Sequence, residues 1–316
     1  MAKVLLAGGS GLIAAHILRI LLERGYTVIT TVRSQEKGDH IIKAQPESLK
    51  PKLSYATVGD IAQRDAFNAF DDPILDVLQP AINGTVGILK AIEYAPQAKR
   101  VVITSSFAAI VNTESPPKVY DESSWNPITW DESLSDKSKT YRGSKVSNDV
   151  CRKGGMGILD KEKPSFDVTT INPPLVYGPV THHLENLDRL NTSNLIIRDI
   201  IQGKYKDNPL PPTGTFLFTD VRDLTLAHVR AIEVPEAGGK RFFVVAGHGS
   251  HKQIVDGLRK THPGLSSRLP ENPQDDFPTD VYGYDNSRAR EILGIDFKPL
   301  QDCIKDTATS LLGLGA

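Results

Sequence analysis

The chain has 316 residues, a formal net charge of −1 at pH 7 and two cysteines. Its length suffices for one large domain or two smaller ones with a substantial core. The balanced charge argues against a nucleic-acid partner, and two cysteines are too few for a disulfide scaffold. No signal sequence precedes the first apolar run, and no apolar run approaches the roughly 20 residues that cross a bilayer. These features predict a cytoplasmic protein without a membrane partner.

The first segment has the order strand, glycine-rich turn and helix. Val4–Ala7 is an apolar run, and apolar residues recur at helical spacing from the turn to Leu21. In this context the glycines predict a dinucleotide site, because backbone N–H groups must approach a pyrophosphate closely and a helix N-terminus favours the same anion. Two registers fit, the general Rossmann spacing from Gly9 and the short-chain dehydrogenase spacing from Gly8. The residues expected to bind the cofactor here are Gly8, Gly9, Ser10, Gly11, Leu12 and Ile13.

Basic residues follow the second predicted strand. This strand covers residues 26–32 and ends at Arg33, with Lys37 one helical turn further on. An acidic residue at this place holds the ribose 2′-hydroxyl of NAD, whereas a guanidinium suits a 2′-phosphate. The alternative is a pair of solvated basic residues in a loop, but their position relative to the glycines favours NADPH.

The third strand is predicted over residues 53–58. Asp60 and Ile61 follow it, and we expect them to contact the adenine ring. A helix is then predicted over residues 66–70. The fourth buried strand of such a fold is missing from the pattern, which passes directly into a second helical segment over residues 74–92.

A strand predicted over residues 101–106 ends in hydroxyl side chains, and Tyr141 opens a later helix that also contains Lys145. Side chains at this spacing emerge on one helix face. Tyrosine, with a reference pKa of about 10, is a poor acid near neutral pH, but a nearby lysine cation and an oxidised nicotinamide favour the phenolate. We expect Tyr141 to protonate a carbonyl oxygen, Lys145 to assist it and hold the nicotinamide ribose, and Ser106 to hydrogen-bond the same carbonyl oxygen.

The regular alternation loosens after a strand predicted over residues 166–171. The segment 182–215 mixes helix with proline-rich loop and is expected to cover a cleft. Its His182-His183 pair has a single carboxylate close by, Glu185, so we predict a solvated loop there and no metal site.

These elements predict an α/β fold with a doubly wound, Rossmann-type parallel sheet and a smaller C-terminal α/β substrate lobe. The cofactor domain is expected at residues 1–175 and the lobe at 176–316, with some chain returning to the first domain around 215–232. The later strands and helices of this half are expected over residues 216–220, 224–232, 241–245 and 300–312.

Taken together, the motifs resemble the extended short-chain dehydrogenase/reductases, and closely their dihydroflavonol-reductase-like branch, which includes fungal NADPH-dependent aldehyde and methylglyoxal reductases. The resemblance covers nearly the full length. It implies that Ser106 is the catalytic serine, that the backbone of Val176 contacts the nicotinamide and that Ser193 touches the cofactor. It rests on residues 7–14, 31–37, 100–111, 141–145, 172–179, 190–193, 220–223 and 285–294.

The sequence departs from this branch in two places. The branch carries an additional segment after Phe70, with a central strand and a loop beside the nicotinamide. Without that segment, either the strand at 101–104 shifts to fill the gap or the sheet is weakened, since unpaired strand edges are unfavourable. The catalytic helix also runs into a glycine-rich stretch over residues 146–157, where each mid-helix glycine costs about 1 kcal/mol relative to alanine. Both departures are typical of an error in an assembled coding sequence.

The predicted function is the NADPH-dependent reduction of a small-molecule aldehyde or ketone by a monomer or weak homodimer. A nucleotide-sugar epimerase or dehydratase on the same scaffold is a second enzymatic interpretation, which Arg33 and Lys37 disfavour because such enzymes retain NAD. A sensor or defective isoform that binds NADPH without catalysis is the alternative from another class. The missing strand favours that alternative, and the intact residues Ser106, Tyr141 and Lys145 disfavour it.

Overall fold

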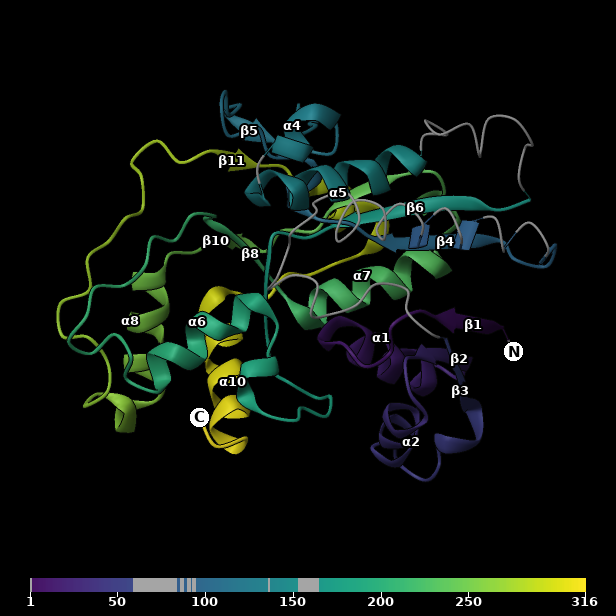
Figure 1. Cartoon of the computed structure of the whole chain (residues 1–316), viewed down its shortest axis with the longest axis horizontal. Helices are drawn as coiled ribbons and strands as arrows, with labels where there is room; N and C mark the ends of the chain where they lie inside the picture. The colour runs from purple at the N-terminus through teal and green to yellow at the C-terminus, as the bar shows by residue number, and fades with distance from the viewer. Residues whose placement is uncertain are drawn as a thin grey trace.

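The computed structural model describes residues 2–58, 84–85, 88–89, 92, 95–135, 137–152 and 165–316. Strands and helices alternate over residues 3–57 (Figure 1). The strands are β1 (Lys3–Leu6), β2 (Thr27–Val32), β3 (Leu53–Thr57), β4 (Arg100–Thr104), β5 (Val119–Tyr120), β6 (Asp167–Asn172), β7 (Leu175–Tyr177), β8 (Leu217–Asp220), β9 (Arg241–Phe243), β10 (Gly247–His248) and β11 (Gly283–Tyr284). The helices are α1 (Leu12–Glu23), α2 (Gln35–Lys43), α4 (Trp130–Ser135), α5 (Lys137–Arg152), α6 (Thr192–Ile201), α7 (Val221–Glu233), α8 (His251–Thr261), α9 (Ser287–Leu293) and α10 (Leu300–Gly313).

The first three strands form a parallel sheet in the order β1-β2-β3. In β2 the sequence Thr-Val-Ile-Thr-Thr-Val is rich in β-branched residues, and half-buried positions alternate with buried ones. Helix α1 covers this sheet by packing Leu18, Leu21 and Leu22 with Val28 of β2 in one apolar cluster. The predicted strand–helix–strand unit at the N-terminus is therefore confirmed.

A second parallel sheet has the order β4-β6-β9. Helix α7 packs against α1 and also against β4 and β6, so it joins the two sheets, as Figure 1 shows. At this junction Leu12 of α1, Ile171 of β6 and Leu224 of α7 belong to one buried apolar cluster. Parallel sheets flanked by helices give the Rossmann-like arrangement that the sequence predicts.

The two sheets are not hydrogen-bonded to each other within the described part of the chain, where β1 pairs with β2 and β4 pairs with β6. Leu5 in the middle of β1 is 63% exposed, although the strands of a doubly wound sheet are normally covered on both faces. Of the two alternatives that the sequence leaves open, the structure does not shift β4 into the gap beside β1. Within the residues that the structure describes, the parallel sheet is interrupted there.

The smaller lobe is built from β7, β8 and β10 with the helices α6, α8 and α10. In it β7 pairs in parallel with β8, and β10 pairs with β8 in antiparallel orientation. Helices α6, α8 and α10 lie together on the side of the molecule away from β1 (Figure 1). Their apolar side chains, including Ile197, Leu258 and Ile304, share one buried cluster. In contrast to the sequence-based assignment, β9 does not belong to this lobe, because it pairs with β6.

Some predicted segments are only partly described. The helix predicted over residues 66–70 lies outside the described residues, and so does the glycine-rich run 153–157. Of the helix predicted over 74–92, the described residues are helical. Helix α5 begins at Lys137, one turn before Tyr141, where the sequence places its start. Among the described residues, no helix combines the length and the apolar character that crossing a membrane requires.

Candidate active site

The glycine turn between β1 and α1 is held tightly against β2. Gly8 adopts a φ of 73°, a left-handed conformation that favours glycine, and its N–H donates to Thr31 Oγ1 at 3.1 Å. The Gly9 N–H donates to the Thr31 carbonyl at 3.2 Å. A Cβ on Gly9 would lie 2.0 Å from Thr30 Oγ1, so only glycine allows this approach. The turn therefore has the close backbone geometry that a dinucleotide site requires.

The N-terminus of α1 is available to an anion. Its N-cap is Gly11, no side-chain hydrogen bond caps the helix, and its first turn contains no acidic residue. The first N–H groups of a helix lack intrahelical acceptors, and the helix dipole gives this end partial positive charge. The site fits the pyrophosphate of a dinucleotide, which would take the place of a capping side chain.

The basic residues predicted to bind a 2′-phosphate lie next to this turn. Arg33 follows β2 directly and is exposed. Lys37 lies in the first turns of α2, where its N–H donates to Oγ of the N-cap residue Ser34 at 3.4 Å. Gly9, Ser10, Arg33 and Lys37 all line one cavity of about 350 Å³. The predicted adenine contacts, Asp60 and Ile61, lie outside the described residues.

The predicted catalytic residues gather where β4 ends and α5 passes. Ser106 follows β4, and its Oγ accepts a hydrogen bond from the Ala108 N–H at 3.1 Å. Helix α5 packs against the short 3₁₀ turn at 107–109 that begins directly after Ser106. On α5, Lys145 Nζ lies 5.5 Å from the centroid of the Tyr141 ring, and Tyr141 is 44% exposed. The tyrosine and the lysine thus share one accessible helix face, as the sequence predicts.

Val176 and Ser193, far apart in sequence, are in direct contact. The Val176 N–H donates to Ser193 Oγ at 3.2 Å. Asn191 Nδ2 donates to the Val176 carbonyl at 3.0 Å, and Asn194 Nδ2 donates to the Gly178 carbonyl at 2.9 Å. The start of α6 therefore holds the end of β7 in place. The sequence interpretation singled out Val176 and Ser193 but not the two asparagines, whose role depends on a loop contact that no local pattern reports.

A second oversight concerns the histidines after β7. The sequence interpretation placed His182 and His183 in a solvated loop. In the structure the His183 ring packs on His40 of α2, with 4.6 Å between ring centroids and 57° between ring planes, although His183 remains exposed. Both histidines line the same cavity as Arg33 and Lys37. The spacing of His40 and Lys37 on α2, one turn apart, is the only local signal for this arrangement.

Comparison with known proteins gives matches over the whole chain. The model of the NAD dependent epimerase/dehydratase family matches residues 4–246. The ketoreductase azaE of Aspergillus niger is 44% identical over 333 positions, covering 98% of this chain and 97% of the relative. The NADPH-dependent methylglyoxal reductase GRE2 of Saccharomyces cerevisiae is 31% identical, covering 98% of each. A crystal structure of Gre2 from Candida albicans in complex with NADPH matches with a TM-score of 0.89 at 30% identity, covering 100% of each chain.

These matches also bear on the missing segment. The alignment with azaE spans 333 positions, whereas this chain has 316 residues, so the relative contains residues that this chain lacks. UDP-glucose 4-epimerase of Thermotoga maritima, at 17% identity and a TM-score of 0.71, shares the fold. The resemblance to extended short-chain dehydrogenase/reductases is confirmed: the chain belongs to the NAD dependent epimerase/dehydratase family.

Proposed function

We propose that this protein is an NADPH-dependent reductase of aldehydes or ketones. The observation that carries the proposal is the pairing of Tyr141 and Lys145 on one accessible face of α5, packed beside the turn that follows Ser106. The curated relatives support it, because they include a ketoreductase and an NADPH-dependent methylglyoxal reductase.

In the proposed reaction each side chain has one task. NADPH supplies a hydride to the carbonyl carbon when it is bound. Tyr141 donates its hydroxyl proton to the carbonyl oxygen, so that the product is an alcohol. Lys145 stabilises the phenolate that Tyr141 leaves. Ser106 accepts from the Ala108 N–H, which turns its own hydrogen away from that group, and this hydroxyl donates to the carbonyl oxygen.

The basic residues beside the glycine turn favour NADPH over NADH. Arg33 and Lys37 line the cavity beside Ser10, where a 2′-phosphate would add two negative charges. The crystal structure of Gre2 from Candida albicans in complex with NADPH is consistent with this assignment. A nucleotide-sugar epimerase with NAD shares the fold, but these cations favour the phosphorylated cofactor.

We extend the proposal to the substrate and the setting of the enzyme. The substrate is a small neutral carbonyl compound bound in the lobe. The lobe and the cofactor domain divide near residue 175, and β9 returns to the sheet of the cofactor domain. The enzyme works in the cytoplasm as a monomer or weak homodimer. Light scattering after size exclusion, and fractionation of cells that express the tagged protein, test the last two points.

Replacing Tyr141 by Phe tests the catalytic assignment. We expect Tyr141→Phe to lower kcat by a factor on the order of 10²–10⁴, because it removes the proton donor. NADPH affinity, measured by the fluorescence of the bound nicotinamide, should change by less than about twofold, since the ring and the fold remain. The assay follows NADPH consumption with small aldehydes, dicarbonyls and aromatic ketones, with NADH alongside.

The control is Tyr205→Phe, which removes an equivalent hydroxyl in the smaller lobe away from α5 and should keep wild-type turnover. Retained turnover in Tyr141→Phe would remove that residue from the role. A folded wild-type protein that binds NADPH but reduces no compound of the panel would favour a binding-only protein, for which the lack of pairing between β1 and β4 among the described strands is the structural argument.

A further inference from the structure

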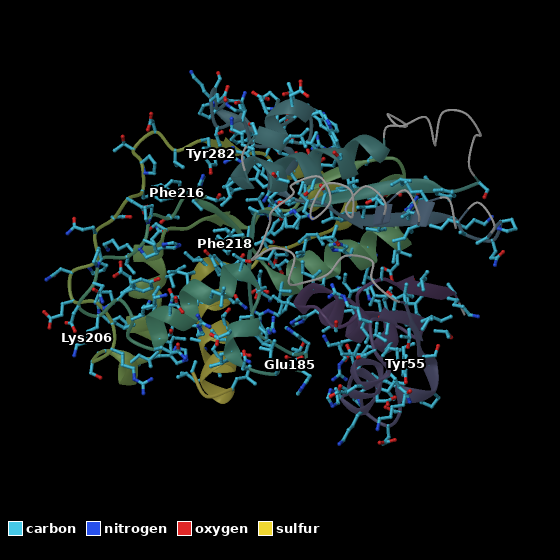
Figure 2. The ribbon with its side chains drawn as sticks, in the orientation of Figure 1. Tyr55, Glu185, Lys206, Phe216, Phe218 and Tyr282 are labelled. Carbon is cyan, nitrogen blue, oxygen red and sulfur yellow. The ribbon has the colours of Figure 1, made fainter. Side chains whose placement is uncertain are left out.

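The cavity beside Arg33 has a wall that comes from the smaller lobe. One side consists of the glycine turn, α1 and α2, which contribute Ser10, Arg19 and His40 among others. The opposite side is the segment after β7, from Thr181 to Arg189. Figure 2 shows Glu185 of this segment on the side of the lobe that faces the module containing Tyr55 of β3. Residues some 140 positions apart in sequence thus enclose one space next to the predicted 2′-phosphate site.

Hydrogen bonds hold this wall of the cavity in place at both ends. His16 of α1 donates from Nε2 to the Pro179 carbonyl at 2.9 Å, and burial lowers the pKa of His16. The Val180 N–H donates to Ser310 Oγ of α10 at 2.9 Å. At the far end Arg198 of α6 donates to the Leu187 carbonyl at 3.0 Å. The segment is therefore held in place independently of the His40–His183 contact.

The charge of the cavity suits an anion. The described lining residues include four permanent cations, Arg19, Arg33, Lys37 and Arg189, against one carboxylate, Glu185. Arg19 and Arg189 make long ion pairs on the surface, at 3.8 Å with Glu23 and at 4.0 Å with Glu185, and exposed ion pairs of this kind are weak. The remaining polar rings that face the cavity are those of His16, His40, His182 and His183.

The cavity is larger than a single phosphate group bound by Arg33 and Lys37 would require. A water molecule accounts for about 30 Å³, so 350 Å³ corresponds to on the order of ten waters, more than a single phosphate group displaces. The space also accommodates the ribose that carries the phosphate, with the His40–His183 pair at its edge.

We propose that the segment Thr181–Arg189 closes the 2′-phosphate compartment from the lobe side, and that His183, positioned on His40, is a specificity-determining residue for the phosphorylated cofactor. This inference rests on the proposed function. His183 donates a ring N–H to the 2′-phosphate across the cavity from Arg33 and Lys37. Cofactor selection then involves both parts of the molecule, the N-terminal part formed by β1–β3 with α1 and α2, and the smaller lobe.

The test compares two ligands that differ by the 2′-phosphate alone, adenosine 2′,5′-bisphosphate and adenosine 5′-monophosphate, by calorimetry on the full chain. We expect His183→Ala to weaken the bisphosphate about tenfold, the effect of losing one hydrogen bond to a charged group. The monophosphate should change by less than about twofold. His183→Arg should keep the preference, since it retains a phosphate donor. His262→Ala, which changes a histidine at the end of α8, is the matched control and should leave both affinities unchanged.

The outcomes separate the inference from the proposed function. If the wild type prefers the bisphosphate, Arg33→Ala reduces that preference and His183→Ala does not, the inference is wrong and the NADPH assignment stands. Equal weakening of both ligands by His183→Ala would also overturn the inference, because it indicates a packing role without phosphate recognition. If the wild type binds both ligands equally, the NADPH assignment itself fails.

Discussion

One buried carboxyl group, that of Asp223, makes the stability of the junction between the two sheets depend on pH. Asp223, in the first turn of α7, is 4% exposed and accepts a hydrogen bond from the Lys298 N–H at 2.7 Å. Burial, together with the neighbouring Asp220, raises the pKa of Asp223 to about 6, from an ordinary value of 3.8. Because the folded-state pKa is the higher one, the folded protein binds this proton more tightly than the unfolded chain. The stability that it contributes is present below about pH 4 and is lost as the pH rises through 6.

Asp223→Asn tests this sign. The amide keeps a carbonyl acceptor for Lys298 and removes the buried charge, so we expect the variant to gain stability relative to wild type between pH 4.5 and pH 7.5, by at most about 3 kcal/mol. Urea titrations at the two pH values measure the free energy of unfolding. Asp302→Asn, an exposed residue in the first turn of α10, is the control and should show almost no pH-dependent difference. If Asp223→Asn instead lost stability relative to wild type as the pH rises, the burial argument would be wrong.

At the scale of elements, the packing of the turn before α1 against β2 depends on the absence of a side chain at Gly9. A Cβ on Gly9 would lie 2.0 Å from Thr30 Oγ1, which itself donates to the Leu6 carbonyl of β1 at 3.0 Å. We expect Gly9→Ala to push the turn away from β2, to cost about 1–3 kcal/mol of stability and to weaken NADPH binding by at least about tenfold. Thermal unfolding and nicotinamide fluorescence measure the two effects.

The matched control for this change is Gly264→Ala. A Cβ there meets no atom within 4 Å, so the substitution should alter neither stability nor cofactor binding. Wild-type NADPH affinity in Gly9→Ala would show that the turn can move without loss, and the close-approach argument would then fail.

At the scale of the whole molecule, the exposure of β1 among the described residues predicts that this strand tolerates truncation of an apolar side chain. Leu5 in β1 is 63% exposed, whereas Leu21 in α1 is fully buried. We expect Leu5→Ala to change the free energy of unfolding by under about 1 kcal/mol, and Leu21→Ala to cost about 2–5 kcal/mol. Urea titration gives the free energy of unfolding of both variants, so the same truncation compares the exposed site in β1 with the buried site in α1. Equal costs at both positions would mean that the face of β1 that carries Leu5 is covered in solution.

The length of the chain bears on the history of the coding sequence. The alignment of 333 positions with azaE requires residues that this chain of 316 lacks. A sequenced transcript that contains additional codons after Phe70 would support an assembly error. Transcripts identical to the present sequence would show that the shorter chain is the native one.

The sequence by itself determined the local features of the site. The apolar run, the glycines and the following helical spacing predict β1, the turn and α1, because they reflect backbone sterics and periodicity within a few residues. The spacing of Tyr141 and Lys145 predicts a shared helix face for the same reason. Arg33 is recognisable because its distance from the glycines is fixed by one strand–helix–strand unit.

Only the tertiary structure decided which distant segments meet. It places β9 beside β6, leaves the β1 edge unpaired within the described residues and brings His183 of the lobe onto His40. Strand pairing and loop docking depend on burial summed over the whole fold, and the local pattern around β9 or His183 is the same wherever the segment packs. The sequence therefore specified the chemistry of the site, and the packing of the two parts of the molecule specified what encloses it.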